Sequence, residues 1–304
     1  MKHIPVLVKE VLQALAMTPD GIYVDATLGG ASHAYEIASK LTTGHLYGFD
    51  QDPFALKTAT QKLSVFPNVT IIASNFRYLT RELKKRNVSQ VQGILMDIGV
   101  SSFQLDDPSR GFSYHHDAPL DMRMDTTVEF TAAEIVNTYS EAQLKELFTI
   151  GEVPFTNRLV DRIIEIRKTT PITTTFELVD IIQQVAPRVE KKKRHPARLV
   201  FQALRLEVNQ ELQVLEEAIS QALELLAPGG RLAIITFHSL EDRMVKQAFQ
   251  QASTVDNPLG VPIRDIELKP KFKLITKKPI TATDAELAMN PRSSSAKLRV
   301  IERL

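Results

Sequence analysis

Strand-like and helix-like segments alternate through the first hundred residues of this 304-residue chain, and this order limits the fold more than any other feature. Runs of β-branched and apolar residues predict strands at 22–25, 45–50, 69–76 and 93–100. Amphipathic stretches of roughly ten residues separate them and predict helices. Strands that are joined through helices run parallel, with right-handed crossovers. The sequence therefore predicts an α/β fold built on a parallel sheet.

The alternation stops between residues 105 and 205, where only helices are predicted. Two of them open with capping boxes, at Thr131 with Glu134 and at Ser140 with Gln143. After this stretch a long amphipathic helix ends at "APGG" (227–230). Strands follow at 231–239 and 297–303, and Ser239 is expected to cap the helix between them. We therefore expect a discontinuous sheet domain, 1–104 with 206–304, that carries an all-helical insertion, 105–205.

The composition excludes several kinds of chemistry. The chain has no cysteine, so it can form no disulfide, thiolate zinc site, iron–sulfur cluster or cysteine nucleophile. Its net charge of +1 means that any basic surface is local. The first residues lack the pattern of a signal peptide, and no apolar run is long enough to span a membrane. We expect a cytoplasmic protein that does not enter a membrane.

A glycine turn follows the first predicted strand, in "DATLGGASH" (25–33). It does not match the G-x-G-x-x-G fingerprint that cradles a pyrophosphate. Asp50 ends the second strand, where an acid accepts hydrogen bonds from ribose hydroxyls. A nucleoside without pyrophosphate suggests S-adenosylmethionine, and Asp25 would favour its sulfonium and amino groups. The alternative is an ordinary turn that holds no ligand.

Asp97 ends the fourth predicted strand and should lie at the same edge of the sheet as the glycine turn. A carboxylate beside a methyl donor can accept hydrogen bonds from an exocyclic amine and orient its nitrogen for attack. Methylation at cytosine carbon-5 or by radical chemistry normally needs cysteine, so transfer to nitrogen or oxygen remains. A purely structural acid is the alternative at this position.

Long motifs resemble the RsmH (MraW) family of ribosomal RNA methyltransferases almost end to end. They are "HIPVL" (3–7), "DATLGGASH" (25–33), "MDIGVSSFQLDDPSRGFSYHHDAPLDMRMD" (96–125), "HPARLVFQALRLEVN" (195–209), "APGGRLAIITFHSLEDRMVK" (227–246) and "NPRSSSAKLRV" (290–300). The resemblance implies a class I S-adenosylmethionine-dependent methyltransferase fold, Rossmann-like, with the helical insertion as an RNA-recognition domain. It implies methyl transfer to N4 of a cytidine in the decoding region of 16S ribosomal RNA, within the small ribosomal subunit.

The resemblance also implies the site. Asp97 would hold the amine, no metal would take part, and the cofactor would contact Ala31, Ser32, His33, Asp50, Phe76, Asp97 and Gln104. The chain departs from the family pattern at Ser32, where glycine is usual, and at Ser294, where arginine is usual. Two alternatives stay open: a methyltransferase for another RNA base or a protein, and a non-catalytic RNA-binding relative. A nucleotide-dependent oxidoreductase is disfavoured because the G-x-G-x-x-G fingerprint is absent. A homodimer is an open possibility.

Other residues have two readings each. The basic run 191–195 is a candidate RNA contact or an ordinary solvated face. Aromatic side chains near the central motif could stack on bases or anchor the insertion; these are Phe103, Phe112 and Tyr114. Asp121, Arg123 and Asp125 alternate, which favours an internal ion-pair network over a magnesium site.

Replacing Lys191, Lys192 and Lys193 with alanine should weaken RNA binding, because lysines that contact phosphates release counterions. The slope of log affinity against log salt should fall by about 2 if all three lysines contact single-stranded RNA. Filter binding of a 16S RNA fragment at several salt concentrations measures this slope. An unchanged slope would remove the basic run from the RNA interface.

Overall fold

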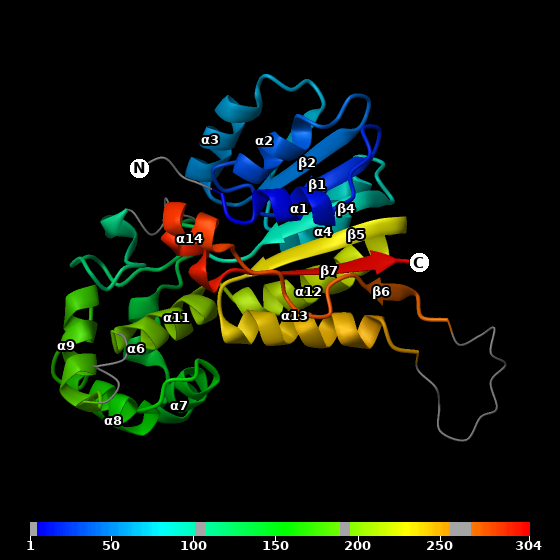
Figure 1. Cartoon of the computed structure of the whole chain (residues 1–304). Helices are drawn as coiled ribbons and strands as arrows, with labels where there is room; N and C mark the ends of the chain where they lie inside the picture. The colour runs from blue at the N-terminus through cyan, green and yellow to red at the C-terminus, as the bar shows by residue number, and fades with distance from the viewer. Residues whose placement is uncertain (1–4, 101–106, 189–194, 256–268) are drawn as a thin grey trace. The chain divides into compact units, whose positions relative to one another are not determined.

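The computed structural model describes residues 5–100, 107–188, 195–255 and 269–304 (Figure 1). The chain divides into two compact units. The sheet unit comprises residues 1–99 and 214–304, and the helical unit comprises residues 100–213. Gln104, Phe103 and the lysines at 191–193 lie outside the described residues.

A seven-stranded sheet forms the centre of the sheet unit, in the order β3-β2-β1-β4-β5-β7-β6. Its strands are β1 Ile22–Asp25, β2 His45–Asp50, β3 Val69–Ala73, β4 Val91–Asp97, β5 Leu226–Thr236, β6 Phe272–Leu274 and β7 Lys297–Arg303. The pairs from β3 to β5 are parallel, and β7 runs antiparallel to both of its neighbours. The predicted α/β fold with a largely parallel sheet is confirmed.

Helices cover both faces of this sheet (Figure 1). One face packs on α1 Val8–Ala14, α2 Ser32–Ala38 and α3 Pro53–Leu63, and the other packs on α4 Leu79–Lys84, α12 Glu211–Leu225 and α13 Ser239–Ala252. Alternate residues of β4 serve the two faces, because Leu95 packs with the first set while Ile94 and Met96 pack with the second. The unit also contains α14 Asp284–Met289 and the 3₁₀ turns η1 Phe76–Tyr78 and η3 Pro291–Ser295.

The strand register places three acids at the carboxyl edge of the sheet. Asp25 of β1 lies beside Gly48 of β2 and Leu95 of β4. Asp50 is the last residue of β2, two positions after Gly48, and Asp97 is the last residue of β4, two positions after Leu95. Ligands of open α/β sheets bind at this edge, because the loops that leave the strands open a crevice there.

Three local predictions are wrong. Phe76 does not lie in a strand, because β3 ends at Ala73 and Phe76 begins η1. The "APGG" residues do not simply end a helix: α12 ends at Leu225, and residues 227–230 bulge from the start of β5, between the pairs Val91–Leu226 and Gly93–Arg231. Ser239 does not cap α13, because His238 occupies the N-cap position and its ring accepts from the backbone N–H of Glu241.

The helical unit is built from α6 Ala132–Thr138, α7 Glu141–Ile150, α8 Thr156–Ile166, α9 Thr175–Val185, α11 Ala197–Val208 and the 3₁₀ turn η2 Pro108–Arg110. The helices share one apolar core of their own. Both predicted capping boxes, Thr131 with Glu134 and Ser140 with Gln143, are confirmed. Within the described ranges of both units, no helix combines the length and the apolar character needed to cross a membrane.

The predicted ion-pair network in the helical unit is confirmed in part. Arg123 forms a bidentate pair with Asp121, from its Nε at 2.8 Å and its Nη2 at 2.6 Å. Asp125 accepts instead from the backbone N–H and the hydroxyl of Thr127. The loop is therefore held by paired charges and local turns.

Asp242 of α13 ties this helix to β7. Its carboxylate accepts from buried Arg299 at 2.7 Å and from Lys297 at 3.3 Å. Burial alone would raise the pKa of Asp242, but hydrogen bonds from Arg299 and the charges of both partners hold it below its ordinary value. Its contribution to stability is therefore present above the unfolded-state pKa of about 4 and is lost as pH falls through the lower folded-state pKa.

Asp242→Asn should lower the free energy of unfolding by about 2 kcal/mol at pH 7, because Arg299 is left buried without a countercharge. The difference from the wild type should shrink below pH 4, where the wild-type carboxyl is itself protonated. Urea denaturation at pH 7 and pH 3 measures both values. Glu141→Gln, which breaks an exposed pair with Lys145, is the control and should leave the midpoint unchanged. Equal midpoints for Asp242→Asn and the wild type at pH 7 would contradict this account.

Candidate active site at the carboxyl edge of the sheet

The turn between β1 and α2 is bent by left-handed backbone at Gly29 and Ala31. Gly29 has φ +47°, and Ala31 has φ +53°. Nothing lies within 4 Å of the point where a side chain on Gly29 would stand, so its backbone is open to a ligand. Ala31 is fully buried and tolerates a conformation that costs an alanine about 1 kcal/mol. The broken glycine fingerprint therefore still gives a tight turn with an uncovered backbone.

Asp50 fastens this turn to the end of β2. Its Oδ2 accepts from the backbone N–H of Gly29 at 2.8 Å, and its Oδ1 accepts from the backbone N–H of Asp52 at 2.9 Å. Burial raises the pKa of Asp50, and these two bonds act in the opposite direction. The backbone N–H of Gln51 acts in the same direction, and a carboxylate has about four acceptor positions, so Asp50 can still accept from a ribose hydroxyl.

Ser32 turns its hydroxyl toward a lysine. Lys62 of α3 donates from its Nζ to the Ser32 hydroxyl at 2.8 Å and to the Gly30 carbonyl at 3.1 Å. Burial lowers the pKa of Lys62. Ser32, one of the two positions where the chain departs from the family pattern, thus gives the turn a hydrogen bond to Lys62 of α3. Ser294, the other departure, is exposed on η3.

Asp97 presents a buried oxygen that has no hydrogen-bond partner among the residues that the structure describes. Its backbone N–H donates to the Thr27 hydroxyl at 2.7 Å, which fixes the end of β4 beside the glycine turn. A quarter of its side chain is exposed, but its Oδ1 is buried and makes no hydrogen bond. Burial raises its pKa to about 7, and the negative charge of Glu241 adds to that shift. An unpaired buried oxygen is costly and points to a group that binds there.

Two further titratable side chains, His33 and Asp25, act on Asp97 or lie close to it. His33 is buried, and its Nδ1 lies 3.5 Å from Asp97 Oδ2. Burial lowers the pKa of His33. Asp25 is 1% exposed and accepts from the backbone N–H of Thr27 at 3.1 Å. Burial raises its pKa to about 6, a shift that the positive charge of His33 would oppose.

Glu241 of α13 is the residue that our sequence analysis missed. It is 1% exposed, its Oε2 accepts from the backbone N–H of Phe237 at 2.9 Å, and its Oε1 lies 2.8 Å from His238 Nε2. Its position was readable, because Glu241, Val245 and Phe249 recur every fourth residue and all face the core. A carboxylate in line with the apolar residues of a helix is therefore expected to be buried, as Glu241 is.

The structure brings together most of the predicted site. Hydrogen bonds and close contacts connect the turn of Ala31, Ser32 and His33 to Asp50 and Asp97. Phe76 is half-buried at the start of η1, three residues after Ala73, which pairs with Asp50. Gln104 lies outside the described residues. No group of three metal-binding side chains occurs in the part of the chain that the structure describes.

The donor and acceptor set fits S-adenosylmethionine. The open backbone at Gly29, the remaining lone pairs of Asp50 and the acidic edge made by Asp25 and Asp97 suit a nucleoside that carries a positive charge. The buried Oδ1 of Asp97 is an acceptor for an N–H group.

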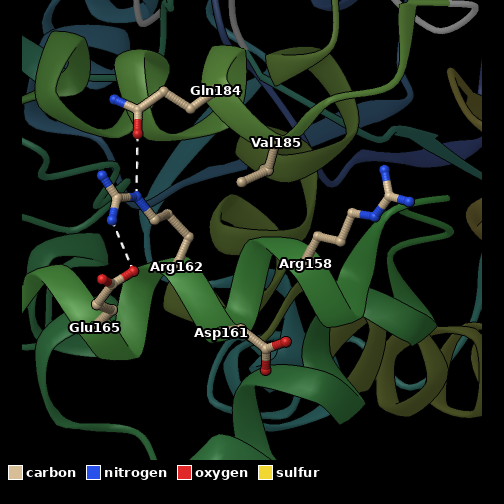
Figure 2. Close-up of a pocket in the computed structure, with 6 residues that line it drawn as sticks. All are labelled: Arg158, Asp161, Arg162, Glu165, Gln184 and Val185. Atoms are coloured by element: carbon tan, nitrogen blue, oxygen red, sulfur yellow. Dashed lines mark hydrogen bonds and ion pairs between the residues drawn. The ribbon is translucent and has the colours of Figure 1, made fainter.

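A separate pocket of about 410 Å³ lies on the helical unit, between α8 and α9 (Figure 2). Figure 2 shows Arg162 between its two partners, Gln184 at 3.0 Å and Glu165 at 2.7 Å. Arg158 and Asp161 complete a charge-balanced lining. None of the predicted site residues lines this pocket, and its balanced charge does not favour phosphate.

The strand order, the glycine turn and the acid at the end of β2 define the class, which is that of the Rossmann-like class I methyltransferases. The model of the MraW methylase family matches residues 1–304, so the chain belongs to this family and is a methyltransferase. The resemblance expected from the motifs is confirmed.

One curated relative agrees with this assignment, and two solved structures are only distantly similar. The chain is 51% identical over 307 residues to a protein of Exiguobacterium sibiricum named ribosomal RNA small subunit methyltransferase H, with 100% of this chain and 98% of the relative covered. Among solved structures, an rRNA methylase from Streptococcus thermophilus is 14% identical with a TM-score of 0.44, covering 100% of this chain and 99% of that one. A SAM-dependent O-methyltransferase from Thermotoga maritima is 10% identical with a TM-score of 0.43, covering 100% and 68%.

Ser32→Gly should leave the affinity for S-adenosylmethionine within about 3-fold, because the hydroxyl is directed at Lys62 and the turn keeps its Asp50 anchor. The free energy of unfolding should fall by about 1 kcal/mol, from the lost hydrogen bond and the added glycine in a helix. Calorimetric titration and urea denaturation measure the two effects.

Ser39→Gly at the other end of α2 is the matched control, since its hydroxyl donates to the Glu36 carbonyl away from the turn. It should leave cofactor affinity unchanged. A change of more than 10-fold in Ser32→Gly alone would place the Ser32 side chain against the cofactor and contradict this geometry.

Proposed function

We propose that this protein transfers a methyl group from S-adenosylmethionine to N4 of a cytidine in the decoding region of 16S ribosomal RNA. The observation that carries the proposal is the buried Oδ1 of Asp97, which has no partner within the described parts of the chain and lies beside the acid-lined turn after β1. The family match and the name of the 51% identical relative support ribosomal RNA of the small subunit as the substrate.

Bound S-adenosylmethionine would supply the methyl group on a positively charged sulfur. We assign the cofactor contacts to the turn of Ala31, Ser32 and His33, to Asp50 and Asp97, and to Phe76 and Gln104. Asp50 would accept from the ribose hydroxyls with the lone pairs that Gly29 and Asp52 leave free. Phe76, half-buried at the head of η1, offers an aromatic edge to the adenine.

Asp97 would hold the exocyclic amine of the cytidine through Oδ1. The nitrogen lone pair of this amine is delocalised into the ring, and an acceptor for its hydrogen localises electron density on nitrogen and fixes its direction. Placing the acceptor at the end of β4, on a backbone pinned by Thr27, limits the positions that the base can take.

The helical unit would contact the RNA, and the predicted insertion 105–205 would form this RNA-recognition domain. Phe112 is 6% exposed in the core of the unit, so it anchors the unit and is not free to stack on a base. Tyr114 stacks on His195, with ring centroids 4.6 Å apart. His195 is the last residue of the basic run 191–195. Arg188 is exposed on the other side of the run in sequence.

The particle that carries the RNA and the state of the enzyme are also part of the proposal. We propose the small ribosomal subunit as the partner and the cytoplasm as the location, and a homodimer stays a prediction. A methyltransferase that acts on another RNA base or on a protein is the alternative, and the product of the reaction distinguishes them.

Deleting the gene should remove N4-methylcytidine from 16S RNA, and the wild-type gene should restore it. Asp97→Ala should not restore it, with transfer reduced by about 1000-fold or more, because the amine loses its acceptor. Its unfolding temperature should be unchanged or raised, since the lost oxygen has no partner. Mass spectrometry of 16S nucleosides and thermal denaturation measure these outcomes.

Asp20→Asn, which changes an exposed acid in a turn, is the control and should restore the modified base fully. Persistence of N4-methylcytidine in the deletion strain would refute the proposed substrate. Loss of a different methylated base would support the alternative.

A further inference from the structure

The hydrogen bond between His33 and Val6 determines which ring nitrogen carries the proton. His33 Nε2 lies 2.8 Å from the carbonyl oxygen of Val6, and both groups are buried. A carbonyl oxygen only accepts, so Nε2 must be the donor. In the neutral ring the other nitrogen, Nδ1, then has a lone pair and no proton.

That lone pair faces a carboxyl group. His33 Nδ1 lies 3.5 Å from Asp97 Oδ2, with the histidine side chain 8% exposed. An unprotonated nitrogen and an ionised carboxylate repel each other, so the contact is favourable only when one proton lies between them. Burial lowers the pKa of His33 and raises that of Asp97 to about 7. Below about pH 7, both shifts favour a proton on the Asp97 carboxyl and a neutral His33 ring in the free enzyme.

We propose that His33 is a positioning residue that receives this proton from Asp97 during methyl transfer, so that the two side chains form a proton relay. The inference rests on the proposed function, because the amine of the cytidine supplies the proton that starts the relay. The relay uses both oxygens of Asp97: the partnerless Oδ1 toward the amine, and Oδ2 toward His33.

The step balances as follows. The amine nitrogen forms a bond to the methyl carbon while the bond from that carbon to sulfur breaks, with its electron pair retained by sulfur. One N–H bond of the amine breaks, and its proton joins Asp97 Oδ1. The proton on Oδ2 moves to His33 Nδ1. The positive charge that was on sulfur ends on the His33 imidazolium, and no base stronger than histidine is needed.

The charges around the relay support its direction. The titratable groups that act on His33 are Asp25 of β1, Glu286 of α14 and Lys62 of α3, and Asp97 of β4 contacts it. The negative charges of Asp25 and Glu286 raise the pKa of His33 and so stabilise an imidazolium once the sulfonium charge is gone. Asp97 faces Glu241 of α13, and Asp25 is influenced by both Asp97 and Asp50. The charge of Glu241 favours the protonated form of Asp97 before the reaction.

The first test uses the free enzyme and needs no substrate. Nitrogen chemical shifts of ¹⁵N-histidine-labelled protein, assigned by comparison with His33→Gln, report the protonation of each ring nitrogen. We expect Nε2 protonated and Nδ1 unprotonated at pH 8 and still at pH 7. A His33 imidazolium at pH 7, or the opposite tautomer, would overturn the relay whether or not the enzyme methylates cytidine.

The second test is the pH profile of His33→Gln. Glutamine can donate to the Val6 carbonyl from near the position of Nε2, but it cannot accept a proton. Single-turnover methylation should be about 10-fold slower than the wild type at pH 6, because about a tenth of the Asp97 carboxyls is ionised one pH unit below a pKa of about 7. It should recover toward the wild type by pH 9, where the Asp97 carboxyl is ionised and accepts the amine proton directly. An equal defect at all pH values would show a merely structural role and overturn the relay.

His45→Gln is the matched control. His45 Nε2 lies 2.8 Å from the Thr70 hydroxyl at the amino end of β2, and burial lowers its pKa as it does that of His33. The methylation rate of His45→Gln should match the wild type from pH 6 to pH 9. If the wild-type protein itself methylates no cytidine, the proposed function fails, while the nitrogen shifts still decide the protonation of His33.

Discussion

The carboxylate of Asp50 on the backbone of Gly29 is the contact on which the site depends. It joins the end of β2 to the turn after β1, and this turn begins the helix that carries His33. The helix then positions His33 between the Val6 carbonyl and Asp97 at the end of β4. The hydrogen bond from Gly29 to Asp50 thus fixes the turn that would contact the cofactor relative to Asp97, which would hold the substrate amine.

The site concentrates acids that a stable protein would normally avoid. Asp25, Asp97 and Glu241 are buried or partly buried near one another, and burial raises the pKa of Asp25 and Asp97. Elsewhere the sheet unit pairs its buried charges, as Asp242 does with Arg299. This group of acids therefore marks the place where a cation and an amine bind, at some expense of stability.

The sequence predicted the parts of this site that depend on periodicity and topology. Alternating strands and helices placed Asp50 and Asp97 at one edge, because parallel strands end together. The capping boxes at Thr131 and Ser140 were equally readable, since they depend on residues three apart. Contacts between distant segments were not readable: Lys62 on Ser32, and Val6 on His33, join residues about thirty apart. His238 replaced Ser239 as a helix cap because a ring nitrogen can accept from the backbone as a hydroxyl does.

A crystal structure with S-adenosylhomocysteine and a cytidine-containing RNA fragment tests the central claim most directly. The account predicts N4 of the cytidine within hydrogen-bond distance of Asp97 Oδ1, and the ribose hydroxyls of the cofactor on Asp50. The nitrogen and the sulfur should face each other across the space that a methyl group fills. A structure in which Asp97 Oδ1 contacts only the cofactor, with N4 held by other residues, would contradict the account.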